Sequence, residues 1–304
     1  MSLDITSHPV RSGPDELVPS RYALRVGDID VLVVSDGVFA LPATVMSINA
    51  DPAARTAWLN EMFLPDTFDW ALNAFVVRSG GRTILIDAGI GMDPGLDLPR
   101  AGQLIHRLEA AGIDLASVTD VVLTHMHMDH VGGLLVDGVK DQLRPDLRIH
   151  VAGAEVKFWE SPDFSRVSMP PGFPDALRRT AKRFLNEYRS QMRTFETEYE
   201  VAPGVVVQRT GGHTPGHSVV RLASGGDRLM FAGDAVFAVG FEHPDWYNGF
   251  EHDPEEAARA RVRLLRELAA TGEALVATHL SFPSVCHVAV AGDVFRCVPA
   301  VWEY

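Results

Sequence analysis

Short stretches rich in apolar and β-branched residues recur along the chain, separated by glycine, proline and polar residues. This pattern predicts β-strands joined by turns. Gly27-Asp28 predicts a tight hairpin turn between the first two strands, and Gly80-Gly81 predicts a second hairpin. The predicted strands cover residues 22–26, 29–34, 73–79, 83–87, 121–123, 147–151, 205–208, 218–222, 229–232, 285–290 and 294–298.

Helical spacing of apolar residues is found in three segments between these strands. The first covers residues 99–111 and the second runs from residue 173 to about residue 192. A third helix is predicted to begin at Asp253, because an aspartate cap, a proline at Pro254 and an acidic first turn stand in their favoured places. Gly272 is its predicted stop.

Strands and helices alternate without an internal repeat or a low-complexity linker, which predicts one mixed α/β domain over residues 21–304. Residues 1–20 are rich in serine, proline and charge, and we expect them to form an arm on the body or on a partner subunit. Residues 155–200 are the expected insertion or lid.

Acidic residues outnumber basic ones, 40 to 27, and give a net charge of -13. Such a field repels nucleic acid and anionic membranes, and it disfavours polyanionic substrates. Neither a signal peptide nor an apolar run of roughly 18 residues is recognisable, so we expect a cytoplasmic protein outside the membrane. Cys286 and Cys297 are too few for a disulfide framework or a cysteine zinc site, and we expect free thiols.

The candidate chemistry begins in a six-residue loop directly after the strand at 121–123, with His125, His127, Asp129 and His130. Imidazoles and carboxylates at this density need partners, and a divalent metal explains them better than a solvated loop. In an extended loop the first three would project to one side and His130 elsewhere, so one loop could serve two ions. The donors suit zinc, with iron, cobalt or manganese as alternatives. Shortly after this loop, Gly132-Gly133 would let another backbone approach closely.

Three further candidate ligands follow apolar runs: His213, Asp234 and His279. A sheet delivers functional side chains at such positions. Each residue taken singly could be an ordinary hydrogen-bonded loop residue. Together with the loop at 125–130, they indicate a closed metal site.

This set of residues resembles the metal motif of the metallo-β-lactamase superfamily, from about residue 20 to the C-terminus. The resemblance implies a four-layer αββα sandwich, with two sheets face to face and helices outside. It also implies two metal ions. One is held by His125, His127 and His213, the second is held by Asp129, His130 and His279, and Asp234 bridges them.

Further segments are similar to methyl parathion hydrolase and its lactonase-like relatives, and these relatives suggest a homodimer. The segments are residues 35–37, 124–134, 212–217, 277–283, 287 and 295–299. That enzyme is exported, whereas this chain shows no signal peptide, so the substrate stays open.

The resemblance implies hydrolysis by a metal-bridging hydroxide, since two ions about 3.5 to 4 Å apart lower the pKa of a shared water toward neutrality. Asp129 and Asp234 are the candidate catalytic carboxylates, and Asp234 could also orient the hydroxide or carry a proton. Asp87 and His217 are candidates for orienting the ligand imidazoles, with ordinary turn hydrogen bonds as the alternative.

An apolar pocket for a neutral ester, lactone or phosphotriester could be formed by aromatic residues, although core packing is the commoner fate of any one of them. The candidates are Trp159, Phe237, Trp246 and Phe250, and an alignment with gaps to the hydrolase group favours Trp159 and Phe250.

Residue types separate several relatives. Class B β-lactamases place cysteine where this chain has Asp234, and flavodiiron proteins place glutamate at His127. The superfamily's nucleases would need a basic face, and the helical tail of glyoxalase II has no counterpart in residues 285–298. Acylhomoserine lactonases stay close, although several carry a tyrosine that residues 218–233 lack. A mononuclear-iron persulfide dioxygenase also stays open. A non-catalytic module is disfavoured because all seven ligand positions are filled.

Overall fold

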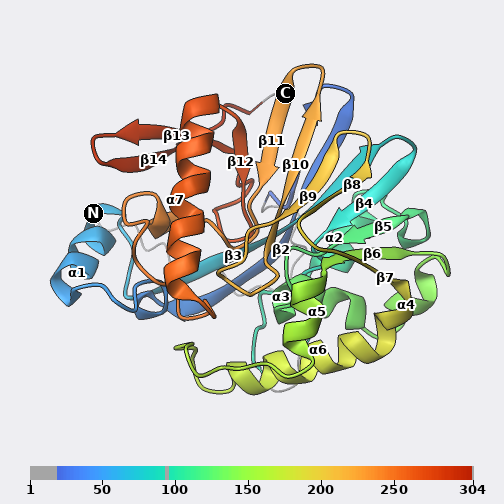
Figure 1. The fold of residues 1–304 in the computed structure, drawn as a ribbon, viewed down its shortest axis with the longest axis horizontal. Helices are drawn as coiled ribbons and strands as arrows, with labels where there is room; N and C mark the ends of the chain where they lie inside the picture. Colours follow the sequence, from blue (N-terminus) through green and yellow to red (C-terminus); the bar gives the residue numbers. More distant parts are fainter. Residues whose placement is uncertain (1–18, 93–95, 303–304) are drawn as a thin grey trace.

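Two seven-stranded sheets pack face to face in the computed structural model, which describes residues 19–92 and 96–302 (Figure 1). The first sheet follows the chain in order. Its first four strands pair with one another antiparallel, and its fourth to seventh strands pair in parallel. These strands are β1 (Arg21–Val26), β2 (Ile29–Pro42), β3 (Thr67–Ser79), β4 (Arg82–Ile86), β5 (Asp120–Val122), β6 (Arg148–Ala152) and β7 (Met192–Phe195).

The second sheet has the order β14-β13-β12-β11-β10-β9-β8. Only β11 and β12 pair in parallel among its described neighbours. Its strands are β8 (Glu198–Ala202), β9 (Val205–Arg209), β10 (Ser218–Ser224), β11 (Asp227–Phe231), β12 (Ala274–Val276), β13 (Cys286–Ala291) and β14 (Val294–Pro299).

Helices cover the outer face of each sheet, and together with the sheets they make four layers (Figure 1). Between the sheets, the rings of Phe75 and Phe231 lie 4.3 Å apart within a continuous apolar cluster. A second cluster joins the first sheet to α2 and α6, and a third joins the second sheet to α7. The predicted αββα sandwich is confirmed. The α-helices are α1 (Pro52–Glu61), α2 (Leu104–Ala110), α3 (Met128–Val131), α4 (Val139–Gln142), α5 (Gly153–Trp159), α6 (Phe173–Tyr188) and α7 (Pro254–Thr271), and the 3₁₀ turns are η2 (Ala43–Met46), η3 (Leu115–Ser117), η4 (Gly132–Leu135), η5 (Arg189–Gln191) and η6 (Ala238–Gly240).

The local signals in the sequence were good guides to the hairpins and to α7. Val26 pairs with Ile29 across the first predicted turn. Asp253 caps α7 by accepting a hydrogen bond from the Glu256 amide, and the helix ends at Gly272 with a φ of 70°. Both ends of α7 therefore lie where the predicted cap and stop residues stand.

Several short elements carried no clear periodic signal. Helix α1 buries only Trp58 and Leu59 among its ten residues, so it lacks a helical apolar stripe. Helix α3 has four residues, which is too short for a periodicity to be recognised. Elements of this size form because their neighbours pack around them.

The predicted insertion at residues 155–200 includes regular parts of the fold. Helix α6 buries Leu177 and Phe184 in the helical layer, and β7 pairs with β6 at the sheet edge. Residues 160–172 form neither helix nor strand. A lid role for this region stays a prediction. The predicted arm at residues 1–20 lies outside the described residues, except for 19 and 20.

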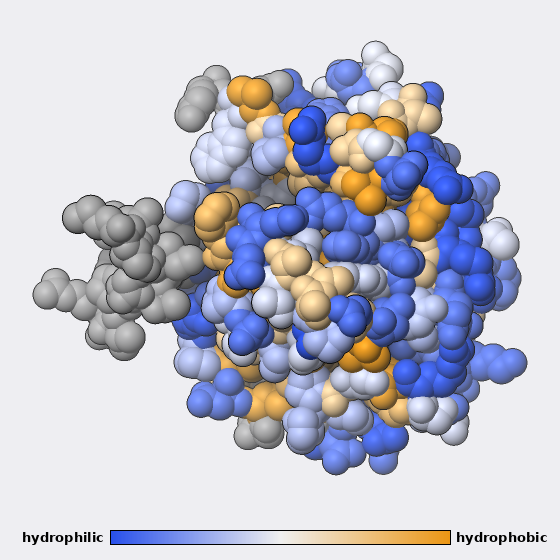
Figure 2. Space-filling model, turned by 90° about the vertical axis from the view of Figure 1, so that its left-hand side faces the viewer, coloured by the Kyte–Doolittle hydropathy of each residue, from blue (hydrophilic) through white to orange (hydrophobic). Residues whose placement is uncertain are grey.

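Hydrophilic residues dominate the face drawn in Figure 2, with small apolar patches between them. No described helix is both long and apolar enough to cross a membrane. The large apolar side chains that are exposed are Ile48, Met62, Phe63, Met92, Tyr199, Val290, Val298, Val301 and Trp302.

Candidate metal centre

The loops that carry the candidate ligands lie where strands of both sheets end. Strand β5 leads into the loop at 125–130, β11 leads to Asp234 and β12 leads to His279, while His213 lies between β9 and β10. Residues from both halves of the sequence therefore meet at one edge of the sandwich. The seven predicted ligands form two groups of neighbouring donor atoms, and Asp234 belongs to both.

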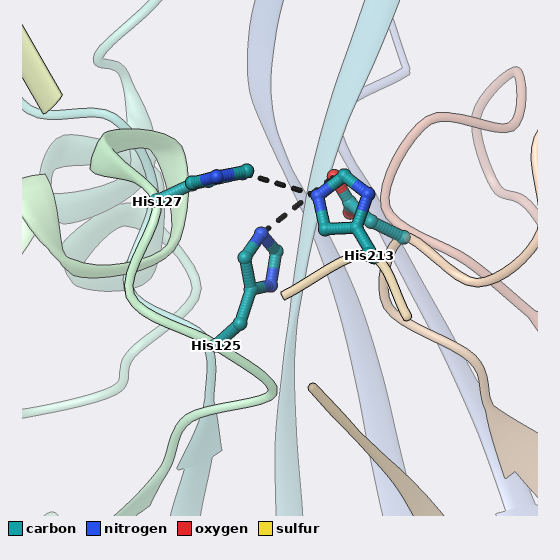
Figure 3. A group of neighbouring side chains, drawn as sticks. His125, His127 and His213 are labelled. Carbon is teal, nitrogen blue, oxygen red and sulfur yellow. Dashed lines mark hydrogen bonds and ion pairs between the residues drawn. The ribbon is translucent and has the colours of Figure 1, made fainter. Parts of the chain in front are cut away.

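The first group consists of His125, His127, His213 and Asp234, all buried (Figure 3). The Nδ1 atom of His127 lies 3.1 Å from Nε2 of His213. The Oδ2 atom of Asp234 lies 3.4 Å from His213 Nε2 and 3.9 Å from His125 Nε2. Three imidazole nitrogens and one carboxylate oxygen thus converge on one point.

The second group consists of Asp129, His130, His279 and Asp234. Asp129 Oδ2 lies 3.5 Å from His130 Nε2 and 3.4 Å from His279 Nε2. Asp234 turns Oδ1 toward His130 Nε2 at 3.3 Å and Oδ2 toward His279 Nε2 at 3.1 Å. The carboxylate of Asp234 therefore stands between the two groups.

The donor atoms fit metal ions in spacing and in bonding. Zinc ligands at about 2.0–2.1 Å in a tetrahedron stand about 3.3 Å from one another, and the separations above lie around that value. His125 Nε2, His130 Nε2 and Asp234 Oδ1 are buried and have no hydrogen-bond partner among the described residues. Buried polar atoms are rarely left unpaired, so these three atoms are suited to coordinate a cation.

The expected geometry of the loop at 125–130 is wrong in one respect. His125 and His127 do point to one group, but Met128 begins the helical turn α3. A helical turn rotates the chain by about 100° per residue, which brings Asp129 and His130 to the same second group. The glycines behave as predicted: a Cβ on Gly132 would lie 1.9 Å from the Ile90 oxygen, and one on Gly133 would lie 1.9 Å from the Ala88 oxygen.

Asp87 and His217 both contact the candidate ligands. Asp87 Oδ2 lies 2.7 Å from His130 Nδ1, and its carboxylate also accepts hydrogen bonds from the amide and hydroxyl of Thr124 at 2.8 Å. His217 Nε2 accepts a hydrogen bond from the Asp234 amide at 3.1 Å. These contacts fix the ring of His130 and the backbone of Asp234.

Burial and neighbouring charges shift the pKa values of the candidate ligands. Burial lowers the pKa of His125, His127 and His213 well below the usual histidine value, which favours the neutral imidazoles that metals bind. Burial alone would raise the pKa of Asp234, but the charges of His279 and His130 outweigh it and hold that pKa well below its usual value. The residue shared by the two groups is thus kept as a carboxylate anion.

Glu155 of α5 joins the two ligand loops and was not singled out from the sequence. Its Oε1 atom accepts from the Met126 amide at 2.9 Å and from the Trp159 indole at 2.7 Å. Its Oε2 atom accepts from the Thr214 hydroxyl at 2.6 Å and from the Gly216 amide at 2.9 Å. One fully buried carboxylate therefore holds four donors from both sides of the first group.

The two groups open onto a small apolar cavity, with a volume of about 20 Å³, which is space for one water molecule. Besides five residues of the ligand loops, it is lined by Phe39, Trp70, Phe173, Leu177, Asn248 and Phe250. Of the predicted pocket residues, only Phe250 is among these described lining residues. Of the other three, Trp159 lies edge-on to the candidate ligand His127, Phe237 lies under Arg261 and Trp246 is stacked on His243.

Comparisons with known proteins agree with this fold. Residues 68–279 match the family model of the metallo-beta-lactamase superfamily. The hydrolase AbOPH, described as a beta lactamase superfamily member, is 25% identical with a TM-score of 0.83, and the dizinc quorum-quenching lactonase AidC is 24% identical with a TM-score of 0.82. Each alignment covers 94% of this chain and 99% of the other.

A hydroxyacylglutathione hydrolase from a Bradyrhizobium species is 26% identical over 166 residues, which are 52% of this chain and 48% of the relative. The chain spans about half the length of the curated relatives that it matches. Since the family model covers most of the sandwich and all seven candidate ligands, the chain belongs to the metallo-β-lactamase superfamily.

Proposed function

We propose that this chain is a binuclear metal-dependent hydrolase of neutral, hydrophobic esters, lactones or phosphotriesters. The observation that carries the proposal is the position of Asp234. Its Oδ1 atom faces His130 at 3.3 Å, and its Oδ2 atom faces His213 at 3.4 Å. A carboxylate that belongs to two donor groups is placed to bridge two adjacent cations, as in two-metal hydrolytic sites.

The protein's own residues have distinct tasks in this proposal. His125, His127 and His213 would hold one ion, and Asp129, His130 and His279 would hold the other. Zinc suits these donors, and iron, cobalt or manganese are alternatives. Two such ions would supply an activated water and polarise a carbonyl or phosphoryl oxygen. Asp234 holds negative charge at the reacting centre, where a proton released from water can be taken up.

The cavity supports the proposed substrate class. Phe39, Trp70 and Phe250 present aromatic surface beside the two groups, which favours an apolar acyl, alkyl or aryl substituent. The net charge of -13 disfavours polyanions. Since the cavity holds about one water molecule, a substrate has to displace the aromatic side chains that line it as it enters.

One narrower activity lies within this proposal, and a second lies beside it. Cleavage of an acylhomoserine lactone is favoured by the similarity of the whole fold to AidC. Cleavage of a glutathione thioester is favoured by the hydroxyacylglutathione hydrolases, although the match covers about half of their length. Several acylhomoserine lactonases carry a tyrosine in this region, but β10 and β11 contain none. Acylhomoserine lactone cleavage therefore has less support than the broader class of ester hydrolysis.

A hydrolysis screen with metal analysis on the same sample tests the proposal. Aryl esters, aromatic and aliphatic lactones, acylhomoserine lactones, methyl phosphotriesters and a hydroxyacylglutathione should be compared by kcat/KM. We expect two metal ions per chain and the highest kcat/KM for a neutral ester, lactone or phosphotriester. One iron per chain with oxygen uptake on a persulfide would overturn the proposal, and so would inactivity of the metal-loaded protein on the whole panel.

We also propose a homodimer located in the cytoplasm, and neither property bears on the chemistry above. Light scattering on the purified chain measures the mass in solution. A mass of one chain, against 33.2 kDa for the sequence, would refute the dimer.

A further inference from the structure

His252 lies directly behind one of the candidate ligands. Its Nε2 atom is 3.4 Å from Nε2 of His127, on the side of that ring away from His213. Its Nδ1 atom is 3.1 Å from the carbonyl oxygen of Asp163. His252 thus connects a ligand of the first group to the backbone of the segment at 160–172.

The position of protons in this chain of contacts follows from the Asp163 oxygen. A carbonyl oxygen only accepts hydrogen bonds, so Nδ1 of His252 carries the proton. In a neutral ring Nε2 of His252 is then an acceptor, and the donor facing it is the Nε2–H of His127. Nδ1 of His127 is left with its lone pair, and this is the atom 3.1 Å from His213 Nε2.

His127 needs such a partner because it is oriented differently from its neighbours. His130 turns Nδ1 outward to Asp87, and His279 turns Nδ1 outward to the carbonyl oxygen of Ala71 at 2.9 Å. Both rings present Nε2 to the second group. His127 presents Nδ1 instead, so its proton has to stand on Nε2, where His252 lies.

The surroundings of His252 hold its ring and its backbone in place. The rings of Phe158 and Phe164 lie 4.7 and 5.2 Å from the imidazole, which is largely buried. The His252 amide donates a hydrogen bond to the carbonyl oxygen of His213 at 2.8 Å. One residue therefore contacts two ligands of the same group, one through its side chain and one through its backbone.

We propose that His252 is a positioning residue, which holds His127 as the Nε2–H tautomer with Nδ1 directed at the first metal ion. This inference rests on the metal binding in the proposed function. Mutation of a residue that hydrogen-bonds a metal ligand usually lowers metal affinity by about 10 to 100-fold. His252 would act mainly on the first ion, because its contacts are with His127 and His213 and with no ligand that belongs to the second group alone.

The tautomer can be measured without metal or substrate. Two-bond ¹⁵N–¹H correlation spectra of the metal-free protein report which nitrogen of His127 is protonated. We expect His127 to be protonated on Nε2 in the wild type. In His252→Phe we expect a mixture of His127 tautomers, because the phenylalanine ring occupies the same place but offers no acceptor. A wild-type His127 protonated on Nδ1 would overturn the proposal, even if the phenylalanine variant failed to fold.

Competition with a zinc chelator measures the consequence for binding. We expect the first ion to bind about 10 to 100-fold more weakly to His252→Phe, with the second ion little affected. His252→Gln should recover much of the loss, since its amide oxygen can accept from His127. His243→Phe, which alters a histidine stacked on Trp246, is the matched control and should bind both ions normally.

Equal losses in the glutamine and phenylalanine variants, or unchanged affinity in both, would refute the positioning role. These results are distinguishable from failure of the proposed function. If the wild type binds no metal, the hydrolase proposal and the inference drawn from it both fail. If the wild type binds two ions and only the His252 variants give unexpected results, the hydrolase proposal stands.

Discussion

His130 Nδ1 lies 2.7 Å from Asp87 Oδ2, a contact that joins the metal loop to the residue that follows β4. The same carboxylate accepts from the Thr124 amide and hydroxyl, so it anchors both ends of the loop. Asp87 has a φ of 57°, a conformation that aspartate and asparagine adopt more readily than most residues. Its chemistry can therefore be changed with little backbone strain.

Asp87→Asn should weaken binding of the second ion by about 10 to 100-fold. The substitution keeps the size and the backbone conformation but replaces one acceptor by an amide NH₂, which faces either His130 or Thr124. Chelator competition measures the affinity. Asp146→Asn, at an exposed aspartate paired with Arg144, is the control and should bind both ions as the wild type does.

Asp234→Asn should abolish most hydrolysis while the fold is retained, because the variant lacks the negative charge that both donor groups share. Circular dichroism checks the fold, and kcat/KM on the best substrate of the screen measures the loss. Turnover near the wild-type rate would count decisively against the bridging role.

Glu155→Gln should lower the free energy of unfolding by about 1–3 kcal/mol for each donor left unpaired, since an amide NH₂ cannot accept. The Gly216 amide or the Met126 amide then faces another donor in a fully buried site. Urea unfolding measures the change. Glu160→Gln, whose exposed carboxylate pairs with Arg189, should stay within about 0.5 kcal/mol of the wild type. Equal effects in the two variants would contradict the account of Glu155.

Removal of metal by a chelator should abolish hydrolysis, and the addition of zinc should restore it. The unpaired buried atoms His125 Nε2, His130 Nε2 and Asp234 Oδ1 carry this expectation, since they are suited to coordinate a cation. The proposed chemistry requires no nucleophilic side chain. Metal analysis has to show complete removal before the assay. Activity that survives in the metal-free protein would refute the mechanism.

Asp36 should make stability fall as pH rises from about 4 to about 7. Burial raises the pKa of Asp36 to about 7, against an ordinary value of 3.8, although the amides of Ile90 and Leu104 donate to its carboxylate. Between these values the folded state binds more protons than the unfolded state, so this group's contribution declines by up to about 1.4 kcal/mol per pH unit. Asp36→Asn should remove this slope from urea unfolding of the metal-free protein. An unchanged slope in the variant would exclude Asp36 as its source.

The candidate ligands could be found from the sequence because each follows an apolar run and four of them lie within six residues. This pattern did not predict the directions in which Asp129 and His130 point. Their direction depends on a four-residue helical turn, and so short a turn forms only when surrounding contacts support it. The residue types therefore predicted the chemistry better than the geometry.

The cavity was harder to predict because its walls come from distant elements. Phe39 is on β2, Trp70 is on β3 and Phe173 begins α6, and only the packing of sheet and helix brings them together. His252 has no partner at a recognisable spacing in the sequence, and no motif distinguishes Glu155 from other carboxylates on helices. Such residues are defined by what they contact in space.

The origin of the ligands in two sheets couples ion binding to the stability of the whole sandwich. His125 and His130 follow a strand of the first sheet, while Asp234 and His279 follow strands of the second. A bound ion would therefore link the two sheets. Because it binds only the folded state, its binding free energy would add to the free energy of unfolding. By the same linkage, a substitution that loosens the sheets far from the site should lower metal affinity without touching a ligand.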